Sequence, residues 1–515
     1  MTDIATATLE RSSEPAPAKG RDGGLHTRLR RVLLLAVALS FAACVAIDVL
    51  VLRGANTDMW FHLSTGAWIA QHHHVPINDP FSADGIHKTY IAYIWLFSVT
   101  LYWFYRWFGL VGTSAYVVLL ATGTGLALYR AIQRRMGGFA GPIALTAAGI
   151  FVMVPLYSER PWLFSMLFFV IELDILFAEL VDPPKPQASW RIWLLPPLFA
   201  LWANMHIQWV YGLAVLGLAA LTQDVEIVRK ERGLRLAWNP SKRWYRLWVA
   251  TGLCFLATFV NPYTWRLYEV VLEYGRERVP LKMIQEMQAP DFRSPLHYLL
   301  VLLVLGAAFV LGRRRVRSSV FVGALFVAAV LASLRTARDV WFAVAVASMI
   351  IAVGYRKDPA APAEVPLPRF HRFAAAVLAV LLVFSWAGRR DLSNRHLQGL
   401  VEKHYPVKAA EFVSQQGIPG PLYNDYNWGG YLLWRLPQLP VSMDGRAWVY
   451  GDARVERNIE TWNCEKDWKN DPELTSANVV IGSVNARLST ALKEDPRFKI
   501  AYDDGIAIVF VKRRT

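Results

Sequence analysis

Cysteine is scarce in this chain: only three occur among 515 residues. Cys44 and Cys254 fall within apolar runs, and only Cys464 lies in a polar region. This number and placement exclude a disulfide framework and a CxxC metal site. The sequence also lacks a glycine-rich phosphate loop, a Ser-His-Asp nucleophile motif and a kinase signature, so nothing in it supports ATP-driven transport.

Charged residues are also few, at 18% of the chain, whereas hydrophobic residues make up 54% and include 21 Trp. Apolar runs of roughly 15–21 residues recur and are separated by basic loops, which predicts a polytopic α-helical membrane protein. The net charge of +15 does not indicate a nucleic-acid partner. The positive residues lie in short loops beside the predicted spans, where membrane insertion places them.

The basic loops also predict the topology. Arg28, Arg30 and Arg31 precede the first apolar run, which puts the N-terminus in the cytoplasm. Residues 90–108 are long enough to cross the membrane, but their aromatic composition suits the membrane–water interface. If they do not cross, the later basic loops fall in the cytoplasm; if they cross, those loops fall outside. We therefore predict eleven spans, at residues 32–52, 110–131, 139–156, 161–181, 191–204, 210–222, 247–260, 295–312, 318–334, 340–354 and 372–388.

Three regions follow from this topology. Residues 1–27 are polar and predict a disordered cytoplasmic tail. Residues 28–388 form the expected transmembrane domain, with a first outer loop at 54–109. Residues 389–515 have soluble composition and predict an extracytoplasmic α/β domain. Strands are expected there at 421–423, 441–443, 479–481, 499–502 and 506–511, and helices at 407–415 and 486–493. The expected location is the cell inner (plasma) membrane.

The stretch 56–82 holds an unusual density of titratable and aromatic groups for a spacer between spans. Asp58 lies just beyond the first span, and Trp60 and Trp68 would hold it at the interface. Partial desolvation there would raise the pKa of Asp58 toward the working range of a general base. The alternative is a solvated loop acid. His62 follows one helical turn later and is a plausible partner for orienting Asp58.

Other residues of this stretch have weaker functional interpretations. Asp79 precedes Pro80, so an Asx-type turn is as good an interpretation as a contact with substrate. Adjacent histidines on an irregular loop rarely converge on one ion. We therefore predict structural or incidental roles, and no zinc site, for the triplet His72, His73 and His74.

Charges in the later outer loops point to an anionic ligand. Glu159 and Arg160 sit between two spans, either as interface anchors or as a phosphate-binding pair beside a base. Arg266, Arg335 and Arg338 lie outside against the positive-inside trend, which suggests an anion near them. The short hairpin around Asn204 and His206 is expected to end below the outer surface. Asp48, near the outer end of the first span, is expected to face the site.

Several motifs resemble a bacterial branch of the GT-C glycosyltransferase superfamily. They are WFHLSTGAW after Asp58, then DPFS, SERPWLFS, WANMH and VNPYTWRLY, and near the C-terminus YNDYNWGGYLLWRLP and VSMDGRAWVYGD. The superfamily includes lipopolysaccharide sugar transferases, aminoarabinose transferases and protein O-mannosyltransferases. The resemblance implies interfacial helices and an acid in the first outer loop, and a polyprenyl-phosphate sugar donor. Asp58 takes the place of that acid, Asn56 replaces a possible acidic partner, and Glu159 stands for a second acid.

The predicted function is therefore transfer of a sugar from a polyprenyl-phosphate donor to a glycan, lipid or protein acceptor on the extracytoplasmic face, with inversion. Asp58 would be the base, and Arg160 with Arg335 or Arg338 would bind phosphate. His62 and Glu159 would orient groups, and Asp58 with Glu159 would hold a divalent ion if one is used. Arg266, Trp60, Asp79 and His206 complete the predicted substrate site.

Two rival functions stay open at this point. One is a transporter or flippase of a lipid-linked saccharide, and the other is a non-catalytic assembly protein. The C-terminal domain is expected to cover the active site. Its polar residues Asp425, Asp444, Arg446 and Asp452 would either cap turns or shape the acceptor cleft.

Overall fold

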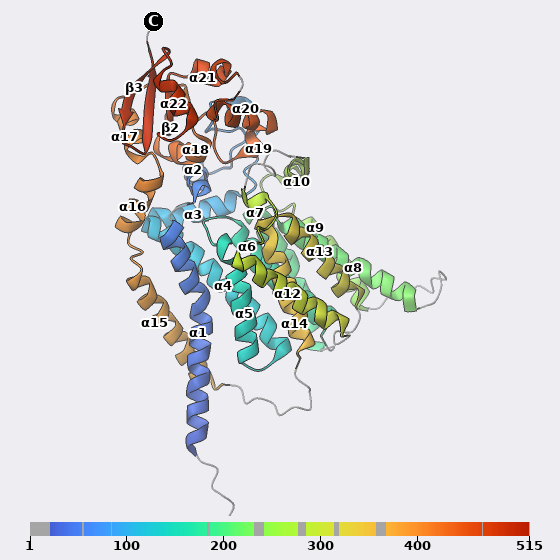
Figure 1. Ribbon diagram of the computed structural model, residues 1–515. Coiled ribbons are helices and arrows are strands. Elements are labelled where there is room, and N and C mark those ends of the chain that lie inside the picture. Colours follow the sequence, from blue (N-terminus) through green and yellow to red (C-terminus); the bar gives the residue numbers. More distant parts are fainter. Residues whose placement is uncertain are drawn as a thin grey trace, which may run out of the picture.

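The computed structural model describes residues 21–53, 56–83, 85–182, 186–230, 242–276, 285–313, 319–356, 367–465 and 467–513. Within them the chain is mostly helical, with a small sheet near the C-terminus (Figure 1). The first helix, α1, spans Arg21–Arg53. Residues 21–27 are thus helical and not part of a disordered tail, whereas 1–20 lie outside the described residues.

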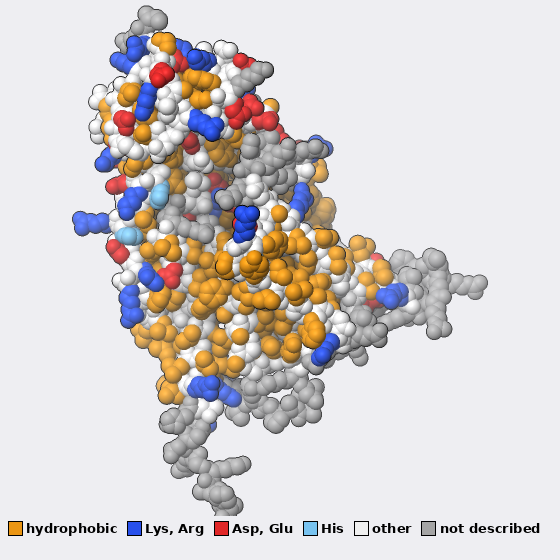
Figure 2. Space-filling model, viewed as in Figure 1, with side chains coloured by type: hydrophobic (Ala, Val, Ile, Leu, Met, Phe, Trp, Pro, Cys, Tyr) orange, Lys and Arg blue, Asp and Glu red, His pale blue; other side chains and the backbone are white. Residues whose placement is uncertain are grey.

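Among the described residues, six helices are long and apolar enough to cross a membrane: Thr27–Leu52, Leu110–Met136, Trp209–Ile227, Pro295–Gly312, Ala337–Gly354 and Arg369–Arg389. Shorter apolar helices at Ala140–Leu156 and Val320–Arg335 accompany them. Figure 2 shows a broad hydrophobic band over this bundle, with charged side chains concentrated above and below it. These features confirm a multi-pass membrane protein, and the number of eleven spans stays a prediction.

The bundle is built from one long run of helices. In chain order they are α4 (Leu110–Met136), α5 (Ala140–Met153), α6 (Trp162–Leu180), α7 (Leu195–Met205), α8 (Trp209–Lys230), α9 (Lys242–Ala257), α12 (Pro295–Gly312), α13 (Val320–Arg335), α14 (Val340–Gly354) and α15 (Arg369–Arg389). Helix α15 packs along α1 at the edge of the bundle (Figure 1). Asp48 of α1 pairs there with Arg390 at 2.8 Å and accepts a hydrogen bond from Trp386. It therefore holds α15 and does not face the site.

The described residues of the segment predicted as the first outer loop, 54–109, are largely helical. Helix α2 (Thr57–His72) begins at Asn56, whose side chain accepts a hydrogen bond from the Asp58 backbone N–H at 3.0 Å, and Asp58 lies in the first turn, where an acid is favoured. The predicted interfacial segment 90–108 contains α3 (Trp95–Phe108), and its first five residues are not helical. A helix of 14 residues extends only about 21 Å, short of a bilayer core of about 30 Å. Its place at the interface stays a prediction.

Residues after 393 form helices around a four-stranded mixed sheet of order β1-β2-β4-β3. The strands are β1 (Leu422–Asn424), β2 (Val479–Ser483), β3 (Phe498–Asp503) and β4 (Ala507–Lys512); β1 pairs parallel with β2, and the other pairings are antiparallel. The helices are α16 (Asn394–His404), α17 (Val407–Gln415), α18 (Tyr426–Arg435), α19 (Ala447–Tyr450), α20 (Asp452–Trp462), α21 (Pro472–Ser476) and α22 (Arg487–Lys493). The strand expected at 441–443 is wrong, because Val441 instead forms an isolated parallel bridge with Ser82, which follows α2 in the chain.

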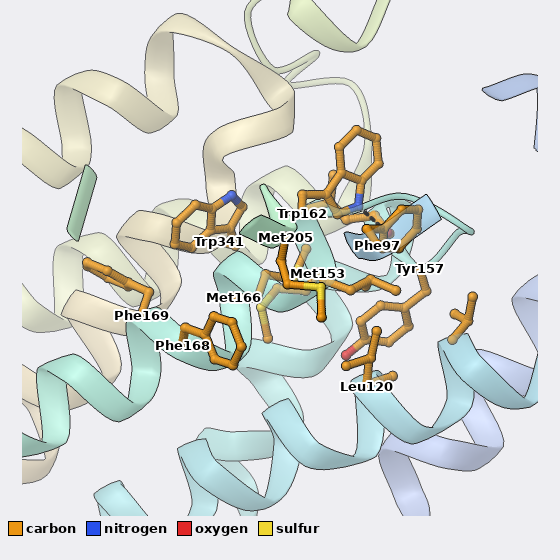
Figure 3. Packing of buried hydrophobic residues seen from close by; sticks show 14 of the residues in the cluster. Phe97, Leu120, Met153, Tyr157, Trp162, Met166, Phe168, Phe169, Met205 and Trp341 are labelled. Carbon is orange, nitrogen blue, oxygen red and sulfur yellow. Dashed lines mark hydrogen bonds between the residues drawn. The ribbon is translucent and has the colours of Figure 1, made fainter. Parts of the chain in front are cut away.

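One buried hydrophobic cluster runs from the bundle into the C-terminal part, where it includes Leu432, Val441 and Val479. Its bundle portion is rich in aromatic and methionine side chains from α5, α6, α7 and α14 (Figure 3). Phe169 packs edge-to-face on Trp341 with ring centroids 5.3 Å apart, a favourable aromatic geometry. Because the C-terminal part shares this core, it is fixed on the upper end of the bundle.

Candidate functional site

A cavity of about 1350 Å³ lies where the upper end of the bundle meets the C-terminal part. Its walls come from helices and loops that are far apart in the sequence. Among the described residues that line it are Asp58, His62, Glu159, Arg160, His206, Tyr274, Glu286, Arg338, Asp425, Tyr426, Gly445 and Trp448. Six of the ten predicted site residues are therefore brought together: Asp58, His62, Glu159, Arg160, His206 and Arg338.

Asp58 and Arg160 form an ion pair at the centre of the lining, and each side chain is 16% exposed. The Arg160 guanidinium also donates to Glu286 at 3.1 Å and to the Asn56 side chain at 2.9 Å, and lies 5.0 Å from the Trp162 ring centroid. Asn56 thus caps α2 and orients Arg160 at once.

Burial raises the pKa of Asp58 to about 6, although Arg160 opposes the rise. The negative charges of Glu286 and Asp444 add to the increase, whereas Arg338 lowers the pKa. A carboxylate with this proton affinity is mostly ionised at neutral pH and can still accept a proton effectively. The geometry therefore agrees with the expectation that Asp58 is desolvated.

Glu159 is 3% exposed and accepts a hydrogen bond from the Asn56 backbone N–H at 3.3 Å. Burial raises the pKa of Glu159 to about 7. Backbone hydrogen bonds and the charge of Arg160 lower the pKa, but their effect is smaller than that of burial. Glu159 is therefore a second carboxyl group of the cavity, close to the point where it changes protonation at neutral pH.

Two buried histidines line the cavity in neutral form. Burial, together with the neighbouring Arg160, holds the pKa of His62 well below its usual range, and burial with Arg338 does the same for His206. The Nδ1 atom of His62 lies 3.2 Å from the Ser98 hydroxyl, and that of His206 lies 2.8 Å from the Ser165 hydroxyl. Both rings are thus oriented and uncharged, which suits hydrogen bonding and not charge stabilisation.

Arg338 is the second guanidinium of the cavity, carried by the 3₁₀ turn Ala337–Asp339. Its neighbour Asp339 fixes this turn by accepting hydrogen bonds from Gln208 and Tyr211, both at 2.8 Å. The Arg338 Nε atom is buried and has no hydrogen-bond partner among the described residues. Arg338 is therefore held in place by its backbone while part of its donor capacity stays unused.

Four predicted site residues do not line the cavity. Arg335 is exposed at the end of α13, and Arg266 lies beside Glu269 at 3.6 Å. Trp60 is buried between α2 and α18, where its ring contacts that of Tyr431 at 4.9 Å. Their predicted contact with substrate is corrected, because these positions face solvent or the protein core.

Asp79 is the fourth of these residues, and it has no exposed surface. It accepts hydrogen bonds from Arg446 at 2.7 Å and from the Ser82 hydroxyl at 2.5 Å. Asp79 is thus a buried ion-pair residue and does not contact a ligand in the cavity.

The described residues do not form a metal site. No group of three or more His, Cys, Asp or Glu side chains within them could hold an ion. Asp58 is engaged by Arg160, and Glu159 by the Asn56 backbone. His72 stacks on Trp68 at the surface, with ring centroids 4.1 Å apart. The predicted pair of Asp58 and Glu159 does not by itself supply a ligand set, so we derive no step through a metal.

Glycines of the C-terminal part allow it to approach α2 closely. A Cβ atom at Gly445 would lie 2.5 Å from the Asp58 Oδ1 atom, and one at Gly430 would lie 3.0 Å from the Thr57 carbonyl oxygen. At Gly429 it would lie 1.9 Å from the Met443 carbonyl oxygen, a contact that no side chain can make. Sequence reasoning missed Gly445, Glu286, Tyr274 and Trp448 as cavity residues, although the WGGY and DGR glycines were a usable signal.

The polar residues predicted at loop ends have divided roles. Asp425 lines the cavity and also caps α18 by accepting a hydrogen bond from the Asn427 N–H at 2.9 Å. Asp444 and Arg446 have no exposed surface, and Asp452 begins α20 outside the cavity lining. Capping and buried pairing therefore describe most of these residues better than direct contact with an acceptor.

Comparisons with known proteins find similarity in structure only. No protein-family model and no curated protein sequence matches the chain. The oligosaccharyltransferase of Archaeoglobus fulgidus, tethered with an acceptor peptide, matches with a TM-score of 0.50 at 11% identity, over 93% of this chain and 74% of that one. ArnT from Cupriavidus metallidurans in the apo state gives a TM-score of 0.46 at 15% identity, over 95% of this chain and 98% of that one. The archaeal oligosaccharyltransferase AglB from Archaeoglobus fulgidus, in complex with an inhibitory peptide and a dolichol-phosphate, gives a TM-score of 0.49 at 10% identity, over 96% of this chain and 74% of that one.

The match with a TM-score of 0.50 concerns the fold. The chain is structurally similar, across most of its length, to GT-C enzymes. The predicted resemblance to that superfamily is therefore confirmed at the level of the fold. At 11% identity the likeness concerns the fold alone, and the chemistry has to be argued from the cavity.

Proposed function

We propose that this protein transfers a sugar from a polyprenyl-phosphate donor to an acceptor hydroxyl on the extracytoplasmic face of the inner membrane. One observation carries the proposal: the desolvated carboxylate of Asp58 pairs with Arg160 in a large cavity at the upper end of a membrane bundle. The GT-C-like fold supports lipid-linked sugar transfer as the reaction class. The acceptor is a glycan, a lipid or a protein.

The lining of the cavity suits both the lipid-linked donor and an acceptor. Apolar side chains line it on the bundle side, which fits a polyprenyl chain: Val49, Leu50, Val152, Leu156 and Val340. Arg160 and Arg338 supply guanidinium donors for the phosphate, a group that arginine binds well. Tyr426 and Trp448 line the C-terminal side, where aromatic faces and nearby polar groups suit an acceptor.

In the proposed reaction, donor phosphate competes with Asp58 for Arg160 and so frees the carboxylate. Asp58 then accepts the proton of the acceptor hydroxyl as its oxygen attacks the anomeric carbon from the side opposite the phosphate. The new glycosidic bond forms as the bond from carbon to phosphate oxygen breaks, and the lipid phosphate leaves with the electron pair. Arg160 and Arg338 stabilise the leaving phosphate, and the configuration inverts.

The proposal places residues 389–515 outside the cytoplasm as a domain that forms one wall of the cavity. The transmembrane domain, residues 28–388, would supply the base and the phosphate-binding arginines. His62, His206 and Glu159 would position substrate hydroxyl groups through hydrogen bonds. The membrane itself would deliver the donor, whose prenyl chain stays in the lipid phase.

The test uses purified protein in nanodiscs with undecaprenyl-phosphate sugars labelled in the sugar, together with an envelope fraction from the host as acceptor source. We expect wild-type protein to release undecaprenyl phosphate and to label the acceptor. Asp58→Asn should lower the rate by about 10²- to 10⁴-fold, because it removes the proton-accepting charge and keeps the size. Asp503→Asn, at the exposed end of β3, is the control and should leave the rate unchanged.

Equal rates for wild type and Asp58→Asn would refute Asp58 as base. Movement of labelled lipid across reconstituted vesicles, without release of undecaprenyl phosphate, would instead indicate a transporter. These two measurements thus separate a bond-forming enzyme from a transporter.

A further inference from the structure

A completely buried charge cluster joins the first outer loop to the C-terminal part. Arg446, with no exposed surface, donates to Asp79 at 2.7 Å and to Asp444 at 2.6 Å. Its guanidinium carbon lies 5.0 Å from the ring centroids of both Phe81 and Tyr90. Three charges from two distant parts of the sequence therefore meet in a dry, aromatic environment.

The remaining hydrogen-bonding capacity of this cluster is also used. Ser82 donates its hydroxyl to Asp79 at 2.5 Å, and the Tyr450 hydroxyl donates to Asp444 at 2.7 Å. Burying charges is costly, and hydrophobic residues of similar volume often stabilise a protein equally well. A buried cluster of this kind is better explained by the geometry that it fixes than by the stability that it adds.

The fixed geometry concerns the turn Asp444–Arg446, which carries Gly445 at its centre. The Arg446 backbone N–H and Nε atom both donate to Asp444 at 2.9 Å, so the turn is closed on itself. Gly445 faces α2, where a Cβ atom would come within 2.5 Å of the Asp58 carboxylate and 3.5 Å of the Phe61 ring. The cluster thus determines how closely the C-terminal part covers Asp58.

We propose that Arg446 is a positioning residue, which with Asp79 and Asp444 holds Gly445 against Asp58 and keeps that carboxylate shielded from water. This inference rests on the proposed role of Asp58 as the base. It also assigns Asp79, which sequence reasoning placed in the substrate site, a function at a distance from the cavity.

The charges facing Asp58 come from several elements: Arg160 from the loop before α6, Glu286 from the turn Gln285–Met287, Arg338 from the turn before α14, and Asp444 from the cluster. The neighbouring histidine of α2, His62, is uncharged. The negative charge of Asp444 contributes to the raised pKa of Asp58. Removing that charge alone should therefore let Asp58 ionise at lower pH.

The experiment measures protonation of Asp58 directly on the full chain in detergent. A water-soluble carbodiimide with glycine ethyl ester modifies protonated carboxyl groups, and peptide mass spectrometry follows Asp58 as a function of pH. We expect Asp444→Asn to shift the midpoint of labelling to lower pH. This variant keeps the neutral pair of Asp79 and Arg446, so the fold is preserved, whereas removing Arg446 would leave two buried carboxylates unpaired.

Asp471→Asn is the matched control, because Asp471 is a buried acid of the same region that caps α21 and does not act on Asp58. In this variant the pH midpoint of Asp58 labelling should equal that of wild type. Gly445→Ala should change the labelling of Asp58, whereas Gly399→Ala, where nothing lies within 4 Å of the added atom, should not. Unchanged labelling of Asp58 in Gly445→Ala, or equal effects of Gly445→Ala and Gly399→Ala, would overturn the proposed shielding. An unmoved midpoint in Asp444→Asn, or equal shifts in both Asp→Asn variants, would show that the cluster does not act on Asp58 and would overturn the proposal as well. No donor or acceptor is needed, so failure of glycosyl transfer and failure of this coupling are told apart.

Discussion

Replacing Asp58 by Asn should stabilise the free protein at neutral pH, although it should remove activity. Burial raises the pKa of Asp58 from its ordinary value of 3.8 to about 6. A pKa difference of this size means that the ionised carboxylate lowers the free energy of unfolding by about 3 kcal/mol relative to the protonated form. Arg160 loses a charged partner in the variant and keeps Glu286 and Asn56. We therefore expect a net gain of about 1–2 kcal/mol in the free energy of unfolding.

The pH dependence gives this prediction its sign. Below the unfolded-state pKa, near 4, Asp58 is protonated in both states and the variant should gain nothing. As the pH rises through about 6, Asp58 of the folded wild type loses its proton and the free energy of unfolding of wild type falls. The difference in this free energy between the variant and wild type then reaches its full value. Thermal unfolding of both proteins in one detergent, from pH 4.5 to 8, measures this difference.

Asp495 supplies an opposite control. Burial acts to raise its pKa, but hydrogen bonds and charge from Arg497, 2.7 Å away, hold it below the usual range. Asp495→Asn should therefore destabilise the protein at neutral pH, and this loss should fade as the pH falls. If Asp58→Asn is less stable than wild type at pH 8, or its effect does not vary with pH, the carboxylate is not desolvated as the structure indicates.

Two further predictions concern packing and topology. Gly429→Ala should lower the free energy of unfolding by about 1–3 kcal/mol or more, because its Cβ atom would lie 1.9 Å from the Met443 carbonyl oxygen. Gly399→Ala, measured in the same unfolding assay, should leave the free energy of unfolding unchanged. In a cysteine-free background, an impermeant thiol reagent added to intact cells should label Thr490→Cys and not Arg28→Cys, both exposed positions; labelling of both or of neither would contradict the odd number of spans.

Local patterns predicted much of the fold. The apolar runs predicted membrane helices, and the helix expected at 407–415 is α17, Val407–Gln415, because helix formation there depends mainly on local sequence. Val441 was assigned to a strand from its neighbours, yet it pairs only with Ser82 through an isolated bridge. Such pairing depends on a partner hundreds of residues away, which local propensity does not contain.

Sequence reasoning found cavity-lining residues where a charge was unusual for its place, but it did not fix the direction in which a side chain points. Asp58 and Arg160 stood out as charges beside apolar spans, and both line the cavity. Arg335 and Arg338 stood out equally, but only Arg338 lines it. Arg335 ends α13, whereas Arg338 lies in the next 3₁₀ turn, after Thr336 in an extended conformation. One sequence without a structure does not locate this break, so it does not show which of the two side chains enters the cavity.

The properties of Asp58 depend on contacts that no local pattern encodes. Its position after the first span explains its presence at the interface, but its proton affinity depends on Arg160, Glu286 and Asp444, which come from three other segments. Gly445 has no Cβ atom, so the C-terminal part can cover Asp58 closely at this position. It contributes space for this contact and supplies no reactive group. A carboxylate that is ionised yet poorly hydrated destabilises the free protein and accepts protons more readily, and both effects arise from the same enclosure. The stability gained on replacing Asp58 is therefore a measure of the desolvation that the proposed chemistry uses.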